Sequence, residues 1–154
     1  MTLDIHQIAN HKIVEMWHLE DFYDLLQQLN ASKMNLIERI YQVFAAADQL
    51  NLDEWIVYFT KEAQFRFGNT APVAGHDKIR QVMAQFFSTI QTMHHEFVGM
   101  YEQDNVVIAE AEVTFTCLDN KVVQIPTVTV FRMQGDFMQD FRLYMDAAPI
   151  YTNQ

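Results

Sequence analysis

The sequence has few of the residues that cross-link secreted proteins or bind polyanions. It contains one cysteine, Cys117, so no disulfide can form within the chain. This fits a reducing compartment. Ten Lys and Arg residues are outnumbered by 20 Asp and Glu residues, which leaves a net charge of −10 at neutral pH. Nucleic acids and anionic membrane surfaces repel such a chain, so we expect neither as a partner.

Long hydrophobic runs are also missing. No apolar stretch reaches the roughly 18 residues of a membrane span, and residues 1–12 lack the basic and then apolar layout of a signal peptide. Hydrophobic residues nevertheless make up 50% of the 154 residues, which is enough for a domain with a buried core. We therefore expect a soluble, cytoplasmic protein.

The C-terminal part of the chain has the composition of a β-sheet. Val, Ile, Thr, Phe and Tyr dominate four segments that tight turns separate, and they predict strands over 93–101, 106–117, 121–133 and 137–146. The last two segments are apolar on both faces. Such a sheet must be covered on each side, by the chain's own helices or by a second subunit.

Helical patterns precede these strands. Apolar residues at three- and four-residue steps predict helices over 33–48 and 77–91. Between them, Asn51 and Glu54 resemble a capping box that begins a second short helix, and a short strand is expected over 63–67. Three helices followed by a meander of strands predict an α+β fold in which an antiparallel sheet wraps around the helices.

The N-terminal segment has a pattern of its own. Residues 2–10 and 12–19 predict a β-hairpin, because the second arm alternates between two apolar faces. Residues 21–29 follow as a short helix with Asp21 as its N-cap, and 30–32 form a linker. We therefore divide the chain into an extension over 1–31 and a main domain over 32–154.

The turns predict how the strands pair. If a turn at 118–121 joins the second and third strands, Glu110 lies opposite Thr129 and Glu112 lies opposite Thr127. A turn centred on Gly135 then adds two residues of the last strand to this face of the sheet. The shared face would carry Glu110, Glu112, Thr127, Thr129, Phe141 and Leu143. Because side chains alternate, a one-residue change in the pairing would exchange the faces.

Three segments occur in a familiar order: NLDEWIVYFTKEAQF, GHDKIRQVMAQFF and TVFRMQGDFMQDFRLYMDAAP. With them, residues 33–150 resemble the SnoaL-like, polyketide cyclase-like branch of the NTF2-like superfamily. The resemblance implies a cone, in which a curved sheet closes over three helices around a hydrophobic pocket. It also implies a homodimer formed through the convex face of the sheet.

The N-terminal segment DIHQIANHKIVEMWHLEDFYDLLQQL resembles the closing hairpin and final helix of SnoaL-like ester cyclases. This resemblance implies that the extension over 1–31 is the tail of a related domain. A plainer interpretation remains open, in which the hairpin only covers the edge of a sheet.

The resemblance also argues against two reactions of the superfamily. This chain lacks the Asp base, the Tyr and the second acid with which ketosteroid isomerases act. It has Glu110, Glu112 and Leu143 where limonene-epoxide-hydrolase-like members carry an Arg and two Asp residues. Neither catalytic set is therefore complete.

Glu110 and Glu112 form the strongest chemical candidate. Two residues apart on one strand, their side chains lie about 7 Å apart, and in an apolar pocket one could serve as the acid and the other as the base. The alternative is that both face solvent or the rim of a dimer. His95 shares a face with Met93 and Phe97, so it is either a catalytic group or a hydrogen-bonded core histidine.

These observations predict a pocket for a small carbonyl-bearing molecule. Glu110, Glu112 and His95 would carry out cofactor-free cyclase, isomerase or lyase chemistry. The residues expected to shape the pocket are Tyr41, Tyr58, Thr127, Thr129, Phe141 and Leu143. No metal site is expected, because adjacent His94 and His95 point to opposite faces of a strand. The alternative function is a non-catalytic module that binds a small hydrophobic ligand or dimerises.

Overall fold

The computed structural model describes residues 4–9, 12–18 and 35–152 of a chain that divides into two units, Met1–Asn35 and Leu36–Gln154. In the first unit, strands β1 (Asp4–Ala9) and β2 (Lys12–His18) pair antiparallel. The short helix expected over 21–29 lies outside the described residues. Within the described part of the chain, no helix is long and apolar enough to cross a bilayer.

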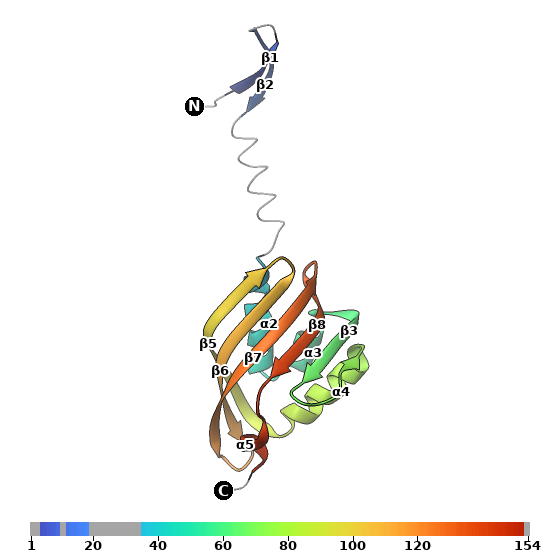
Figure 1. Ribbon diagram of the computed structural model, residues 1–154, viewed down its shortest axis with the longest axis vertical. Coiled ribbons are helices and arrows are strands. Elements are labelled where there is room, and N and C mark those ends of the chain that lie inside the picture. The colour runs from blue at the N-terminus through green and yellow to red at the C-terminus, as the bar shows by residue number, and fades with distance from the viewer. Residues whose placement is uncertain (1–3, 10–11, 19–34, 153–154) are drawn as a thin grey trace. The chain divides into compact units, whose positions relative to one another are not determined.

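The second unit is built on a six-stranded sheet with the strand order β4-β3-β8-β7-β6-β5 (Figure 1). Its strands are β3 (Phe59–Phe67), β4 (Val73–Ala74), β5 (Ile90–Gln103), β6 (Val106–Cys117), β7 (Val122–Gln134) and β8 (Phe137–Tyr144). Most neighbours are antiparallel, but β3 and β8 are parallel. The sheet is therefore mixed, and the prediction of a fully antiparallel sheet is wrong at this pair.

Helices α2 (Leu36–Asp48), α3 (Leu52–Ile56) and α4 (His76–Phe87) lie along one face of this sheet (Figure 1). A short helix, α5 (Ala148–Tyr151), follows β8. Asn51 is the N-cap of α3, because its side chain accepts a hydrogen bond from the backbone N–H of Glu54 at 3.1 Å. The Glu54 carboxylate accepts from the side-chain amide of Asn51 at 3.0 Å rather than from its backbone N–H, so the capping box is only half formed. The stripes of α2 and α4 bury Ile40, Val43, Ile79 and Met83, so these helices fill the concave side of the sheet.

Strand β6 shows which sheet face is buried. Its odd-numbered residues from Val107 to Cys117 are all buried, and the even-numbered residues between them are exposed or half-buried. The buried face packs on the helices in one hydrophobic core. This alternation is the pattern of a sheet with one face in the core and the other turned outward.

The pairing of β6 with β7 differs by one residue from the prediction. Thr129 lies opposite Ala109 and Thr127 lies opposite Ala111, rather than opposite the two glutamates. The cause is a three-residue loop over 118–120, where Asn120 adopts a left-handed conformation with φ of 67°. The backbone N–H of Cys117 then donates to the carbonyl of Lys121 at 2.8 Å. The prediction assumed a two-residue loop.

The pairing of β7 with β8 differs by two residues from the prediction. Thr129 pairs with Leu143, and Phe131 pairs with Phe141. A two-residue change leaves the faces unchanged, so Phe141 and Leu143 still share the inner face with Thr127 and Thr129. The one-residue change on β6, by contrast, turns Glu110 and Glu112 to the outer face.

Candidate functional site

A cavity of about 40 Å³ lies between the sheet and the helices. Twelve of its fifteen lining residues are apolar, and only His95, Thr127 and Thr129 are polar. The apolar residues are Phe44, Ala47, Trp55, Phe67, Met83, Phe86, Met93, Val113, Phe115, Phe141, Leu143 and Met145. The cavity is much smaller than the roughly 300–1,000 Å³ of a drug-sized ligand site. A ligand therefore has to be small or has to move lining side chains.

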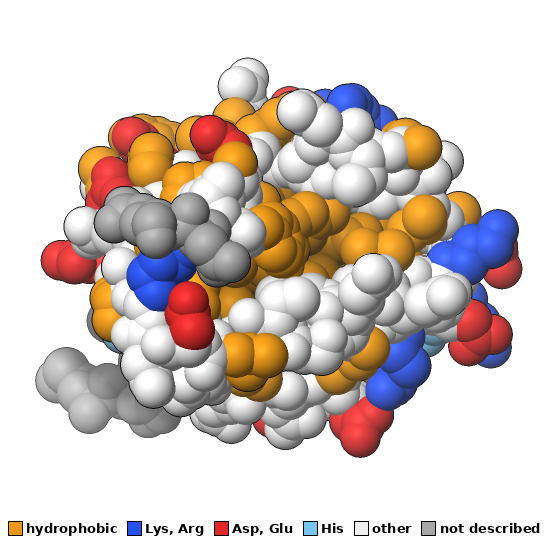
Figure 2. All heavy atoms as spheres, turned by 90° about the horizontal axis from the view of Figure 1, so that it is seen from below, with side chains coloured by type: hydrophobic (Ala, Val, Ile, Leu, Met, Phe, Trp, Pro, Cys, Tyr) orange, Lys and Arg blue, Asp and Glu red, His pale blue; other side chains and the backbone are white. Residues whose placement is uncertain are grey.

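The cavity adjoins a groove at the end of the domain where α5 lies. This groove, lined by residues of 67–70, 145–148 and Tyr151, shares Phe67 and Met145 with the cavity. Seen from this end, the surface is hollowed and hydrophobic side chains fill the hollow (Figure 2). Methionines at 83, 93 and 145 line the cavity, and their unbranched side chains adapt readily to new shapes.

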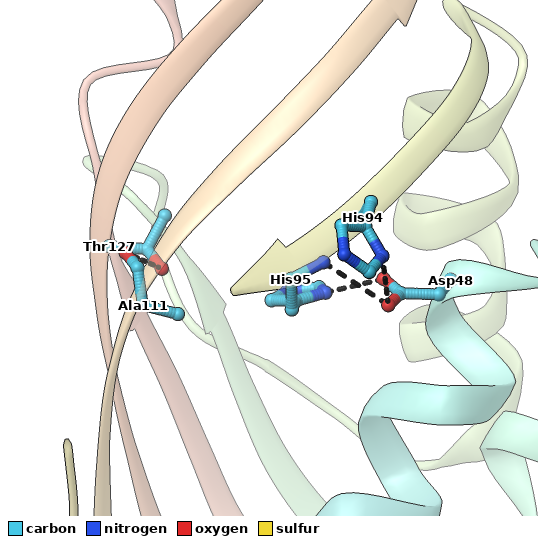
Figure 3. A network of polar contacts seen from close by, with 5 residues as sticks. All are labelled: Asp48, His94, His95, Ala111 and Thr127. Atoms are coloured by element: carbon cyan, nitrogen blue, oxygen red, sulfur yellow. Dashed lines mark hydrogen bonds and ion pairs between the residues drawn. The ribbon is translucent and has the colours of Figure 1, made fainter. Parts of the chain in front are cut away.

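His95 is held on the cavity wall by Asp48. Strand β5 carries His95, and Asp48 is the last residue of α2. The Nδ1 atom of His95 lies 2.5 Å from Oδ1 of Asp48, and the backbone N–H of His95 donates to Oδ2 at 3.1 Å (Figure 3). The imidazole is 10% exposed, and the ring of Phe44 lies 4.6 Å away between centroids. Two contacts to one carboxylate and the aromatic packing fix the orientation of the ring.

This pairing determines which imidazole nitrogen is available for chemistry. An ionised carboxylate can only accept hydrogen bonds, so the Nδ1 atom of His95 must be the donor. In the neutral imidazole, Nε2 then carries the lone pair and can accept a proton. Asp48 would also stabilise the imidazolium that forms, which is the role of the carboxylate in Ser-His-Asp triads. The arrangement is suited to general acid–base chemistry.

His94 approaches the same carboxylate from the surface. Its Nδ1 atom lies 3.7 Å from Oδ2 of Asp48, and its side chain is 77% exposed (Figure 3). Within the residues that the structure describes, no cluster of three or more His, Cys, Asp or Glu side chains could hold a metal ion. Sequence reasoning missed Asp48, because it lies 47 residues before His95 and on a different element.

The buried threonines lie on β7 and differ in their hydrogen bonds. Thr127 is 4% exposed, and its hydroxyl donates to the carbonyl of Ala111 at 3.2 Å (Figure 3). Thr129 is 2% exposed. Among the residues of the described chain, its hydroxyl has no hydrogen-bond partner. The cavity therefore contains one polar group that is already paired and one that is not.

Glu110 and Glu112 do not lie in the cavity, and their expected position on its wall is wrong. Glu110 is exposed opposite Val128, and Glu112 is half-buried opposite Pro126. The physical reason is the three-residue loop over 118–120, which shifts the pairing by one residue and so exchanges the faces.

The two tyrosines expected at the pocket also lie elsewhere. Tyr41 is 46% exposed and packs edge-on against Phe97. The ring of Tyr58 packs against the guanidinium of Arg39, whose Cζ atom lies 4.9 Å from the centroid of the tyrosine ring. Of the predicted site residues, the structure brings together His95, Thr127, Thr129, Phe141 and Leu143.

A family model described as a SnoaL-like domain matches residues 37–140. The chain belongs to the SnoaL-like family. The search of curated proteins gives no match.

Solved structures resemble this SnoaL-like chain at low sequence identity. An NTF2-like protein of unknown function from Burkholderia pseudomallei K96243 is 13% identical with a TM-score of 0.69, over 76% of this chain and 95% of that one. A proposed SnoaL-like polyketide cyclase from Jannaschia sp. CCS1 is 16% identical with a TM-score of 0.67, over 76% and 89%. TerC, co-crystallised with polyporic acid, is 15% identical with a TM-score of 0.66, over 75% and 95%. These similarities show that the SnoaL-like chain has the NTF2-like α+β fold.

Proposed function

We propose that the cavity binds a small, uncharged, carbonyl-bearing molecule and that His95 moves a proton on it without a cofactor. The observation that carries this proposal is the 2.5 Å contact between His95 and Asp48 at the wall of an apolar cavity. General bases need a fixed position and a free lone pair. His95 has both, and it takes over the role first expected of Glu110 and Glu112.

The reaction begins with a proton transfer from carbon. Nε2 of His95 accepts a proton from the carbon next to the carbonyl, the C–H electron pair becomes the new C=C bond, and the carbonyl π electrons move to oxygen. The imidazolium, stabilised by Asp48, then returns a proton to a different atom. An isomerase, a cyclase and a lyase share this first step, and they differ in what the enolate does next.

Two further observations support this choice of ligand. The lining has no charged side chain apart from His95, should it take up a proton, and an apolar wall disfavours a charged ligand. Among proteins with this fold, one is a proposed polyketide cyclase and another was crystallised with polyporic acid. These relatives show the fold, and the proposed chemistry rests on the site itself.

Hydrogen–deuterium exchange of a simple ketone tests the proton transfer without knowledge of the substrate. Wild-type protein should accelerate deuteration of the α-carbons of cyclohexanone in D₂O, followed by proton NMR. His95→Gln should lose this acceleration by about 10²-fold or more, since positioned bases contribute about 10²–10⁴-fold. Asp48→Asn should lose at least about tenfold, because an amide can hold the wrong tautomer.

His94→Gln is the matched control, because it removes the neighbouring histidine outside the cavity. It should leave the exchange rate unchanged. Wild-type exchange no faster than buffer, or an active His95→Gln variant, would rule out His95 as the base.

A second candidate function is ligand binding without catalysis. The small volume of the cavity and its single titratable wall group favour it. In that case cyclohexanone would bind, as measured by chemical-shift titration, without faster exchange of its α-protons.

We also propose a homodimer through the outer face of the sheet. Large hydrophobic residues on β5–β8 are exposed there, among them Val98, Tyr101, Ile108, Val128 and Tyr144. Ile108 lies beside Tyr101, and Val128 lies beside Tyr144. Exposed apolar groups that adjoin across strands are typical of protein interaction sites.

A further inference from the structure

Thr129 has the most unusual environment of the polar groups in the cavity. Its side chain is almost fully buried, yet its hydroxyl donates to no described residue and accepts from none. A buried hydroxyl without a partner destabilises a protein, and native structures rarely keep one without a reason. A ligand that pairs with this hydroxyl would supply the reason.

Thr127 shows that burial on this strand does not itself leave a hydroxyl unpaired. It lies two residues away on the same face of β7, and its hydroxyl donates to the Ala111 carbonyl. The two threonines thus have the same residue type, strand, face and burial. They differ in whether the hydroxyl is available to a ligand.

His95 cannot serve the same ligand atom as Thr129. On β6, the neighbour of His95 is Val113 and the neighbour of Thr129 is Ala109. Four residues separate these neighbours, which corresponds to about 13 Å along the strand. With Nδ1 bonded to Asp48, the Nε2 lone pair accepts hydrogen bonds and cannot donate one to a ketone. Of these two groups, Thr129 alone can therefore donate a hydrogen bond to an uncharged ligand oxygen, and that oxygen is a different one from the carbonyl beside the carbon that His95 deprotonates.

We propose that Thr129 is the specificity-determining contact of this site. Its hydroxyl donates to an uncharged oxygen, a carbonyl or an ether, on a ligand whose remaining surface is apolar. The inference rests on the proposed ligand cavity and adds the contact that selects among ligands. A molecule that reaches both Thr129 and His95 has to be elongated, with the carbonyl whose α-carbon His95 deprotonates near one end and a second uncharged oxygen, bound by Thr129, near the other.

The test compares two ligands of nearly the same shape, cyclohexanone and methylenecyclohexane, in which a CH₂ group replaces the oxygen. Dissociation constants are measured by chemical-shift titration for wild-type protein, Thr129→Val and Thr127→Val. For each protein, the dissociation constant of cyclohexanone is divided by that of methylenecyclohexane. The two ligands differ in hydration, but this difference is the same for every protein and cancels when the ratios are compared. Thr129→Val should weaken binding of the ketone relative to the alkene by about fivefold, as expected for the loss of one neutral hydrogen bond. Thr127→Val should leave the ratio unchanged.

Thermal unfolding of the ligand-free variants gives a second readout. Valine matches threonine in shape, so Thr129→Val removes an unpaired hydroxyl and should raise Tm by about 2–4 °C. Thr127→Val removes a formed hydrogen bond and should lower Tm.

Three results would overturn the inference. The first is an unchanged ligand ratio in Thr129→Val, which leaves the proposed cavity intact. The second is a lower Tm in that variant, which means that the hydroxyl already has a partner. The third is the failure of both compounds to bind wild-type protein, which refutes the ligand cavity and the inference with it.

Discussion

His95 illustrates how one contact changes the meaning of a residue. On sequence alone it shares a face with Met93 and Phe97, a position that favours a hydrogen-bonded core histidine over a catalytic one. The structure adds Asp48 on one side of the ring and an apolar cavity on the other. A purely structural histidine needs a hydrogen-bond partner such as Asp48, but it does not need a cavity beside its ring.

Glu112 provides a prediction at the residue scale. It lies opposite Glu96 on the outer face of the sheet, and like charges directly opposite each other destabilise a sheet. Glu112→Gln should therefore raise the free energy of unfolding by about 0.5 kcal/mol, as measured by urea denaturation. Ketone exchange should be unaffected.

Glu110→Gln is the control for this variant. Glu110 lies opposite Gly99 and Val128, which carry no charge, so its stability should change less. A loss of exchange activity in either variant would mean that the glutamates take part in the chemistry after all.

At the scale of the element, the loop over 118–120 sets the pairing of β6 with β7 and so determines which β6 residues face the cavity. Asn120 has φ of 67°, and its side-chain oxygen accepts from Gln91 Nε2 at 2.9 Å. Alanine is strained in this region of φ, at a cost of about 1–2 kcal/mol, and glycine is not. Asn120→Ala should therefore be less stable than Asn120→Gly by about 1 kcal/mol in urea denaturation. Equal stability of the two variants would show that the loop does not depend on this conformation.

The strands themselves were predictable from local patterns. The strand expected over 106–117 has the bounds of β6, because β-branched residues begin it and apolar and polar residues alternate from Ala109 to Cys117. The pairing was not predictable, since Leu118-Asp119-Asn120 suits a loop of two residues as well as one of three. This difference of one residue in loop length determines whether Glu110 or Ala109 faces the core. The Asp48–His95 contact was equally hidden, because no spacing rule connects the end of a helix to a strand 47 residues later.

At the scale of the whole molecule, the outer face of the sheet has the features of a protein interface. The hydrogen bonds and charge of Asp140 raise the pKa of Arg142, so its guanidinium keeps its charge. Arg132 lies 3.3 Å from the same carboxylate. Since Arg142 pairs with Val130 across β7 and β8, this charged cluster borders the exposed apolar residues. An apolar centre with a polar border is the usual anatomy of an interface.

Val128→Glu tests the proposed homodimer. A charge at this position, between Glu110 and Tyr144, should convert the dimer to a monomer in light scattering at micromolar concentration, because it buries an unpaired carboxylate. Val57→Glu is the matched control, since Val57 is 57% exposed at the C-cap of α3 and not on the sheet. A monomeric wild-type protein, or a dimeric Val128→Glu variant, would contradict the proposal.

The parallel pair of β3 and β8 also has a consequence in time. Phe65 lies beside Phe141, so the strand that completes the hydrophobic core on this side is synthesised after the other five strands of the sheet. Pairings between residues so distant in sequence form slowly, because a long loop must close before the contacts reward it. While the chain emerges from the ribosome, the edge of β3 that later pairs with β8 has no partner strand. The nascent domain is therefore most open to aggregation before β8 has emerged.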